Sequence, residues 1–224
     1  MTDLTLYYTH NLNPRVAVAA ARHLALPMRY VRFEPMGADR EACRPMNPNT
    51  LAPILVENGN SLWETDAIVL RLAKLADSGF WPDEHAAAIM QWVSWSAHHF
   101  TRAGDTFYFE NIIVRRYMDR APDQRALASA EDDFHRLARI LDNVLAQRDW
   151  LVGGGLTYAD FRVATVLPFA GPALLPVVGY ENIVKWHGRL NELAAWREPF
   201  AGLDERALPL AGQTNKLPLA GVTA

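Results

Sequence analysis

The sequence predicts an α/β domain followed by an all-α helical-bundle domain. Two short apolar runs near the N-terminus, residues 4–8 and 29–33, have strand character and flank a helix-like run. Further along, residues 50–68 hold two more strand-like runs around the turn dipeptide Asn58-Gly59. Beyond residue 86, apolar residues recur every three or four positions, which is typical of helices packed on one face.

The first three elements form a βαβ unit. We expect a strand at residues 4–8, a helix at residues 14–23 and a second strand at residues 29–33. Asn13 is predicted to cap the helix, because a short polar side chain before a helical proline can accept from the orphan N–H groups. Pro14 would then be the first helical residue.

The next segment completes the α/β domain. Residues 34–50 are rich in Pro, Asn and Gly and are expected to carry only a short helix. Pro53 heads a strand, Ser61 opens the returning strand, and Thr65 is the predicted N-cap of a helix that ends near Ala76. The order β-α-β-loop-β-β-α is that of a thioredoxin-like domain.

The second half is predicted to be helical throughout. The interruption at residues 78–82 places the boundary, so we expect domains at 1–80 and 86–200 and a tail at 201–224. A helix over 86–118 is expected to break near Gly104, and another covers 127–147. Thr157 and Asp160 match a capping box, in which each residue bonds the backbone of the other.

Composition excludes several partners. The chain has 224 residues, a net charge of −3 and no run of basic residues, so nucleic acid and anionic membranes are not expected. Prolines interrupt the longest apolar stretch, 163–178, which is therefore interpreted as a buried helix and its exit. The N-terminus has no signal-peptide pattern, and the single cysteine, Cys43, suits a reducing cytoplasm.

Two motifs carry a resemblance to the glutathione transferase family. Ala52-Pro53 followed by Glu64-Thr65 is similar to the family's cis-proline and acidic-hydroxyl pair. The segment 154–161 resembles the family's capped central helix, although Gly154 stands where an acidic residue is frequent. The resemblance implies that the residue before the proline pairs with the cysteinyl backbone of glutathione. It also implies that Glu64 and Thr65 hold the γ-glutamyl end.

The reaction that the resemblance implies needs a thiolate. Lowering a thiol pKa from about 8.5 by about two units takes roughly 2.7 kcal/mol, which one charge-assisted hydrogen bond can supply. The loop at residues 9–14 contains neither serine nor cysteine. Asn11 is therefore the first candidate donor to the sulfur, Tyr8 the second and His10 the third.

The remaining predicted contacts follow the family pattern. A cation for the glycine carboxylate could come from the loop before the proline, and the predicted glutathione-binding residues are Arg40, Arg44, Leu51, Ala52, Pro53, Glu64 and Thr65. An electrophile pocket is predicted from side chains of the first helices of the second domain, Trp95, His99, Phe107 and Tyr108. No metal is expected, because adjacent His98 and His99 would point to different faces of a helix.

The function expected from the sequence is addition of glutathione, as co-substrate, to a small hydrophobic electrophile. The family resemblance also implies a homodimer. Two alternatives stay open: glutathione-dependent disulfide reduction, and a non-catalytic binding or scaffolding protein that has kept the fold.

Overall fold

The computed structural model describes residues 3–33 and 39–203. Most of the predicted tail, residues 204–224, lies outside this range, as do 34–38 of the loop before the cis-proline. A mixed sheet has the order β2-β1-β3-β4, with β1 parallel to β2 and antiparallel to β3. Its strands are β1 Leu4–Tyr8, β2 Arg29–Arg32, β3 Ile54–Glu57 and β4 Asn60–Trp63. The predicted α/β region is therefore confirmed.

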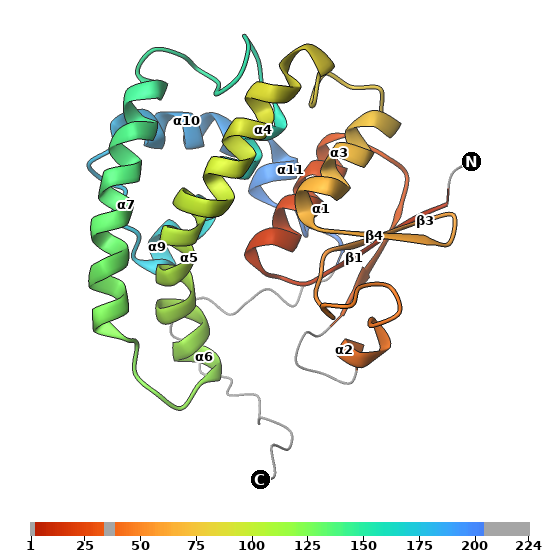
Figure 1. Cartoon of the computed structure of the whole chain (residues 1–224), viewed down its shortest axis with the longest axis horizontal. Coiled ribbons are helices and arrows are strands. Elements are labelled where there is room, and N and C mark those ends of the chain that lie inside the picture. Colours follow the sequence, from red (N-terminus) through yellow and green to blue (C-terminus); the bar gives the residue numbers. More distant parts are fainter. Residues whose placement is uncertain (1–2, 34–38, 204–224) are drawn as a thin grey trace.

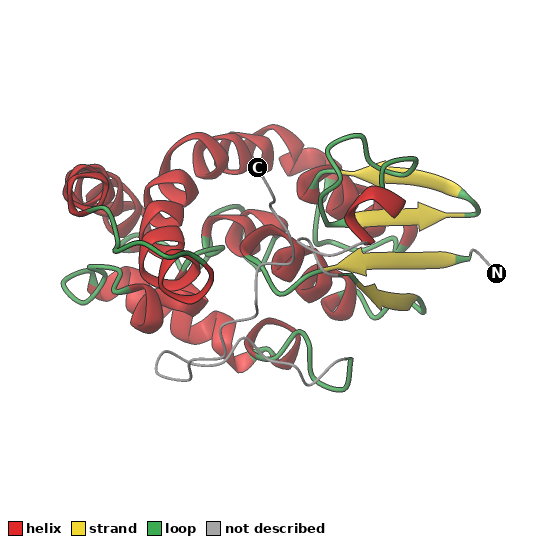
Figure 2. Cartoon of the chain, turned by 90° about the horizontal axis from the view of Figure 1, so that it is seen from below, coloured by secondary structure: helices red, strands yellow, loops and turns green. Residues whose placement is uncertain are grey.

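Helices cover both faces of the sheet (Figures 1 and 2). On one face, α1 Leu12–His23 and α3 Thr65–Leu75 pack against the inward side chains of β1 and β3. On the other face, next to the short α2 Asp39–Ala42, Cys43 packs with Phe33 and Ile54. The alternation of apolar side chains along β1 is what lets each face be covered.

The second half is helical, as predicted. Figure 1 shows α7 running along the outside of the molecule, with α4 and α5 forming one continuous rod beside it. Its helices are η1 Asp83–His85, α4 Ala86–Trp95, η2 Ser96–Phe100, α5 Thr101–Tyr108, η3 Phe109–Val114, α6 Arg115–Tyr117, α7 Gln124–Leu145, α8 Tyr158–Val163, η4 Leu167–Phe169, α9 Ala170–Ala173, α10 Glu181–Glu192 and α11 Ala194–Arg197. Among the described residues, no helix combines the length and the apolar character needed to cross a membrane.

The predicted helix break near Gly104 is wrong. The chain stays helical from Ala86 to Tyr117, and π-helical turns at η2 and η3 take the place of a break. Gly104 is explained by packing instead, since a Cβ there would lie 2.7 Å from Cγ2 of Val166. A glycine therefore lets α5 approach the chain that leaves α8.

Two predicted helix starts are each displaced. Asn11, and not Asn13, is the N-cap of α1, and its side chain accepts from the N–H of Leu12. Glu64 is the N-cap of α3, so Thr65 is the first helical residue rather than the cap. The preference for a polar cap directly before proline predicted Asn13, whereas α1 is capped two residues earlier.

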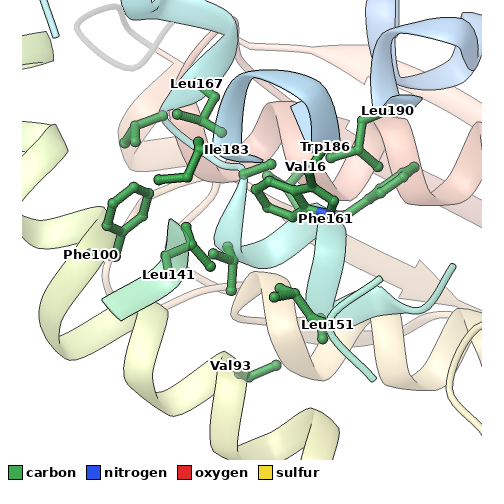
Figure 3. Close-up of a cluster of buried hydrophobic side chains, with 14 of the residues drawn as sticks. Val16, Val93, Phe100, Leu141, Leu151, Phe161, Leu167, Ile183, Trp186 and Leu190 are labelled. Carbon is green, nitrogen blue, oxygen red and sulfur yellow. The ribbon is translucent and has the colours of Figure 1, made fainter. Parts of the chain in front are cut away.

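The helix α1 is buried on two faces, and this joins the sheet to the helical half. Ala17, Val18 and Ala21 pack with the sheet. Val16 and its neighbours Ala19 and Ala20 pack into the larger helical core, which Figure 3 shows around Phe161 and Trp186. Small alanine side chains let the helix fit between two layers at close approach.

The predicted capping box at α8 is confirmed. The Asp160 carboxylate is fully buried, and its Oδ2 accepts from the N–H of Thr157 at 2.9 Å. Its Oδ1 accepts from the N–H of Leu151 at 2.9 Å and from Nε1 of Trp186 at 3.0 Å. One carboxylate thus ties the start of α8 to the preceding loop and to α10.

Asp160→Asn should lower the free energy of unfolding by about 3 kcal/mol, because an amide NH2 would face donors and leave buried groups unsatisfied. The melting temperature should fall by about 10 °C in a thermal unfolding experiment. Burial also raises the pKa of the Asp160 carboxyl. The stability difference between parent and variant should therefore decline as the pH rises from the unfolded-state pKa of about 3.9 through the raised folded-state pKa of Asp160.

The exposed Asp132→Asn is the control for this substitution and should change stability by no more than about 0.5 kcal/mol. Equal stability of the Asp160 variant and the parent would show that the buried carboxylate is not needed to hold α8.

Gly104→Ala should destabilise the protein by about 1 kcal/mol, because overpacking against Val166 outweighs the better helix propensity of alanine. Gly188→Ala is the matched control, since Gly188 also lies within a helix, and a Cβ added there would have nothing within 4 Å. It should stabilise the protein by up to about 1 kcal/mol. Denaturant unfolding of both variants checks the opposite signs, and stabilisation by both would remove the packing explanation.

Candidate functional site

The start of α1 presents a polar side chain at a cavity. Asn11 Oδ1 accepts from the N–H of Leu12 at 2.7 Å, and the Asn11 carbonyl accepts from the N–H of Arg15. The capping bond fixes the orientation of the amide, since it uses the oxygen and leaves the Nδ2 donor for another partner. One residue can therefore cap the helix and donate at the same time.

The cavity lies between the start of α1 and the helical half. Its volume is about 380 Å³. The wall opposite α1 comes from η2, α5 and α8, and the full lining is Asn11, Leu12, Asn13, Pro14, Ala97, Thr101, Arg102, Asp105 and Arg162. Charged and amide groups predominate over apolar side chains in this lining.

Asn13 and Arg162, which both line the cavity, belong to a network that connects three helices. The buried Arg162 of α8 donates through Nη1 to Asn13 Oδ1 at 3.0 Å, and its Nε lies 2.8 Å from Asp66 Oδ1. The same Asp66 oxygen accepts from the hydroxyl of Tyr158. Since these residues stand on α1, α3 and α8, the network fixes the relative positions of the elements around the cavity.

The loop before β3 contains the predicted cis peptide bond, between Ala52 and Pro53. Ala52 lies outside the β1–β3 ladder, and the neighbouring Leu51 is 50% exposed. Asn47, which the sequence analysis missed, holds this loop: its Nδ2 donates to the Leu51 carbonyl at 2.8 Å and its Oδ1 accepts from the N–H of Asn49. These two bonds fix the loop that leads into β3.

The start of α3 combines an unusual backbone with free donors. Glu64 has φ +73° and ψ 125°, a conformation that side-chain-bearing residues rarely adopt. The Thr65 side chain is buried, and its hydroxyl donates to the Asn13 carbonyl at 3.3 Å. Because the first N–H groups of a helix have no intrahelical acceptor, this end can bind an anion.

The two predicted cations occupy different environments. Arg40 donates through Nε to the hydroxyl of Thr50 at 3.0 Å, which keeps it near the cis-proline loop. Arg44 instead forms an exposed ion pair with Glu41, which lowers the pKa of that carboxyl through its hydrogen bond. Arg40 is therefore the better placed of the two to meet a ligand beside Leu51.

The second and third candidate donors do not line the cavity. Tyr8 is buried against the sheet core and stacks on Phe200 at 5.5 Å between ring centroids. His10 stacks on the same Phe200 ring at 4.2 Å. Of the three predicted donors, only Asn11 is in the lining.

The four side chains predicted for the electrophile pocket are also outside the cavity lining. Trp95 stacks on Phe100, and Phe107 packs edge-on against Phe134 of α7. Tyr108 is buried beside Phe169, with its hydroxyl unbonded among the described residues. His99 is exposed. Helical periodicity was thus a signal of core packing for most of these residues.

The cavity brings forward residues that the sequence analysis missed. Thr101 and Asp105 share one face of α5, and Arg102 is next to them. Desolvation raises the pKa of the Asp105 carboxyl. The available signal was their three- and four-residue spacing on one helix, but the prediction favoured the flanking aromatic residues Trp95, Phe107 and Tyr108.

Comparison with known families decides the relationship. The family described as "Glutathione S-transferase, N-terminal domain" matches residues 13–79, and "Glutathione S-transferase, C-terminal domain" matches residues 99–194. The chain belongs to the glutathione S-transferase family. The cis-proline at Ala52-Pro53 and the capping box at Thr157 and Asp160 fall within the two matched regions.

Curated relatives of this transferase-family chain divide into two kinds. "Glutathione S-transferase hmp2" from Hypomyces subiculosus is 26% identical, over 76% of this chain and 85% of that protein. "Elongation factor 1-gamma" from Trypanosoma cruzi is 28% identical over 82% of this chain, but the match spans only 38% of that longer protein.

Solved structures support the fold. A structure described as glutathione S-transferase I from "mais" in complex with an atrazine glutathione conjugate has a TM-score of 0.82 and 20% identity, and the alignment covers 92% of this chain and 100% of that one. A theta class glutathione S-transferase from Xanthomonas axonopodis pv. citri, with glutathione bound, has a TM-score of 0.78 at 22% identity, and the alignment covers 88% of this chain and 96% of that one.

Within residues 3–33 and 39–203, His, Cys, Asp and Glu side chains form no cluster able to hold a metal ion.

Proposed function

We propose that this protein is a glutathione transferase in which Asn11 stabilises the thiolate of bound glutathione. The observation that carries the proposal is that Asn11 lines a cavity at the N-terminus of α1, while its oxygen caps that helix and its Nδ2 has no hydrogen bond to any described residue. A neutral amide cannot ionise, so it would favour the thiolate purely as a hydrogen-bond donor.

The surroundings supply places for the rest of glutathione. Its cysteinyl backbone would pair with Ala52 beside the cis-proline, and its γ-glutamyl carboxylate would meet the free N–H groups at Thr65. Arg40 would face the glycine carboxylate, and Glu64 would face the γ-glutamyl ammonium. These contacts would set the sulfur at the start of α1.

The required energy is within reach of this arrangement. A shift of about two pKa units corresponds to roughly 2.7 kcal/mol. One charge-assisted hydrogen bond contributes about 1.5–3 kcal/mol, and the N-terminus of a helix adds up to about 1 kcal/mol. The thiol proton would pass to solvent, and the sulfur would then form a bond to the electrophilic carbon as the leaving group departs.

The cavity would hold the second substrate next to the sulfur, which gains rate from proximity. This proposal moves the electrophile from the predicted aromatic residues to the polar lining beside Asn11 and Thr101. We further propose a cytoplasmic homodimer with a role in detoxification, as the family resemblance implies.

A second candidate function is a non-catalytic binding or scaffolding role, which the similarity to elongation factor 1-gamma favours. Ultraviolet difference spectra of the protein with glutathione at pH 7 separate the two: a thiolate band supports an enzyme, and binding without this band supports a scaffold. Turnover of a glutathione mixed disulfide but not of an aryl halide would instead assign the protein as a disulfide reductase.

In the proposed complex the Thr65 hydroxyl would turn from the Asn13 carbonyl to the γ-glutamyl carboxylate. Thr65→Val replaces this hydroxyl by a methyl group and should weaken glutathione binding about four- to tenfold, since one hydrogen bond is worth about 1 kcal/mol. Thr65→Ser keeps the hydroxyl and should bind within about twofold of the parent. Isothermal titration of the folded variants checks this. Equal affinities for all three proteins would remove the Thr65 hydroxyl from the site.

Asn11→Asp should raise the pKa of the bound thiol by at least one to two units, or about 1.4–2.7 kcal/mol, because a carboxylate replaces the amide donor. Aspartate caps helices about as well as asparagine, so the start of α1 should persist. Titration of the thiolate absorbance of bound glutathione measures the shift.

Asn11→Ser keeps both an acceptor for the cap and a donor, so it should shift the thiol pKa less than Asn11→Asp. Tyr8→Phe and His10→Ala should leave it within about half a unit of the parent. A large shift in Tyr8→Phe together with none in Asn11→Asp would assign the chemistry to tyrosine.

A further inference from the structure

Two arginine side chains line the cavity beside Asn11, and they differ in how many of their donors are already bonded. Arg162 is buried, and its Nε contacts Asp66 while Nη1 donates to Asn13 and Thr165. No hydrogen bond of its Nη2 group to another described residue occurs. Within the part of the chain that the structure describes, the guanidinium of Arg102 forms neither a hydrogen bond nor an ion pair.

The apolar lining is small by comparison. Only Leu12, Pro14 and Ala97 contribute purely aliphatic side chains, and the nearby aromatic rings pack into the helical core instead. Arg102 is exposed, so a fully apolar ligand that covered it together with Arg162 would remove water from two guanidinium groups without replacing those hydrogen bonds, which is unfavourable.

We infer that the second substrate in this cavity carries a carboxylate, which is bound by Arg102 and by the free Nη2 edge of Arg162. This inference rests on the proposed function and specifies its electrophile. Arginine suits the task because its planar donors match the two carboxylate oxygens. Arg162 is held in position by Asp66 and Asn13, so the carboxylate would meet one fixed guanidinium and one adaptable one.

Asp105 gives the inference an internal test. It lines the same cavity from the same helix, three residues after Arg102, and no hydrogen bond or ion pair of its side chain occurs within the described ranges. Its negative charge would oppose a bound carboxylate, so removing it should strengthen binding, whereas removing the Arg102 charge should weaken it.

The experiment measures the affinity of the full-length protein for two ligands by isothermal titration. The ligands are S-(para-carboxybenzyl)glutathione and the same conjugate with its benzoic acid group as the methyl ester, so they differ in one charge. The parent should bind the acid about tenfold more tightly than the ester, which corresponds to about 1.4 kcal/mol. Arg102→Met should reduce this ratio to about one, Arg102→Lys should keep part of it, and Asp105→Asn should raise it. The exposed Arg139→Met, which removes the same charge on α7 away from the cavity, should leave it unchanged.

Each other outcome is decisive. If glutathione and both conjugates bind, but the affinity for the ester equals or exceeds the affinity for the acid, the carboxylate inference is wrong and the proposed transferase stands. The inference is also overturned if Arg102→Met keeps the acid-to-ester affinity ratio of the parent, as the control Arg139→Met is expected to do. If the protein binds neither glutathione nor the conjugates, the proposed function fails, and the inference fails with it.

Discussion

The burial of α1 on two faces is the constraint on which the rest of the structure depends. One face, with Ala17 and Ala21, packs on the sheet, and the other, with Val16 and Ala20, packs in the helical core. A helix shared in this way leaves no room for the two halves to move apart without exposing apolar surface. Its N-terminal turn therefore sits at a fixed place between them, and the cavity is formed there.

Polar contacts fix the relative positions of the helices at this junction, which apolar packing alone would not determine. Arg162 reaches from α8 to Asp66 at the start of α3 and to Asn13 in α1. The buried Asp160 carboxylate, two residues earlier, holds the start of α8 itself. Buried charged groups of this kind add little net stability, but they are costly to misplace, so they favour one relative position of the elements.

The sequence predicted the fold well and the site only in part, for identifiable reasons. Strand alternation, the Asn58-Gly59 turn and the capping box at Thr157 and Asp160 are local signals, and each appeared where expected. The break at Gly104 failed because its cause is a distant contact with Val166. The cavity residues Arg102 and Arg162 could not be found from spacing, since they are far apart in the sequence and meet only through the docking of α5 and α8 on α1.

The double use of Asn11 has a consequence for motion. Its oxygen accepts from the N–H of Leu12 and the residue lines the cavity, so any fraying of that turn would also displace the proposed donor. Helix ends usually open far more often than whole proteins unfold. In the proposed mechanism, the fraction of time that Asn11 is aimed at the sulfur would be governed by the local opening of a single turn, and hydrogen exchange at the first amides of α1 would report it directly.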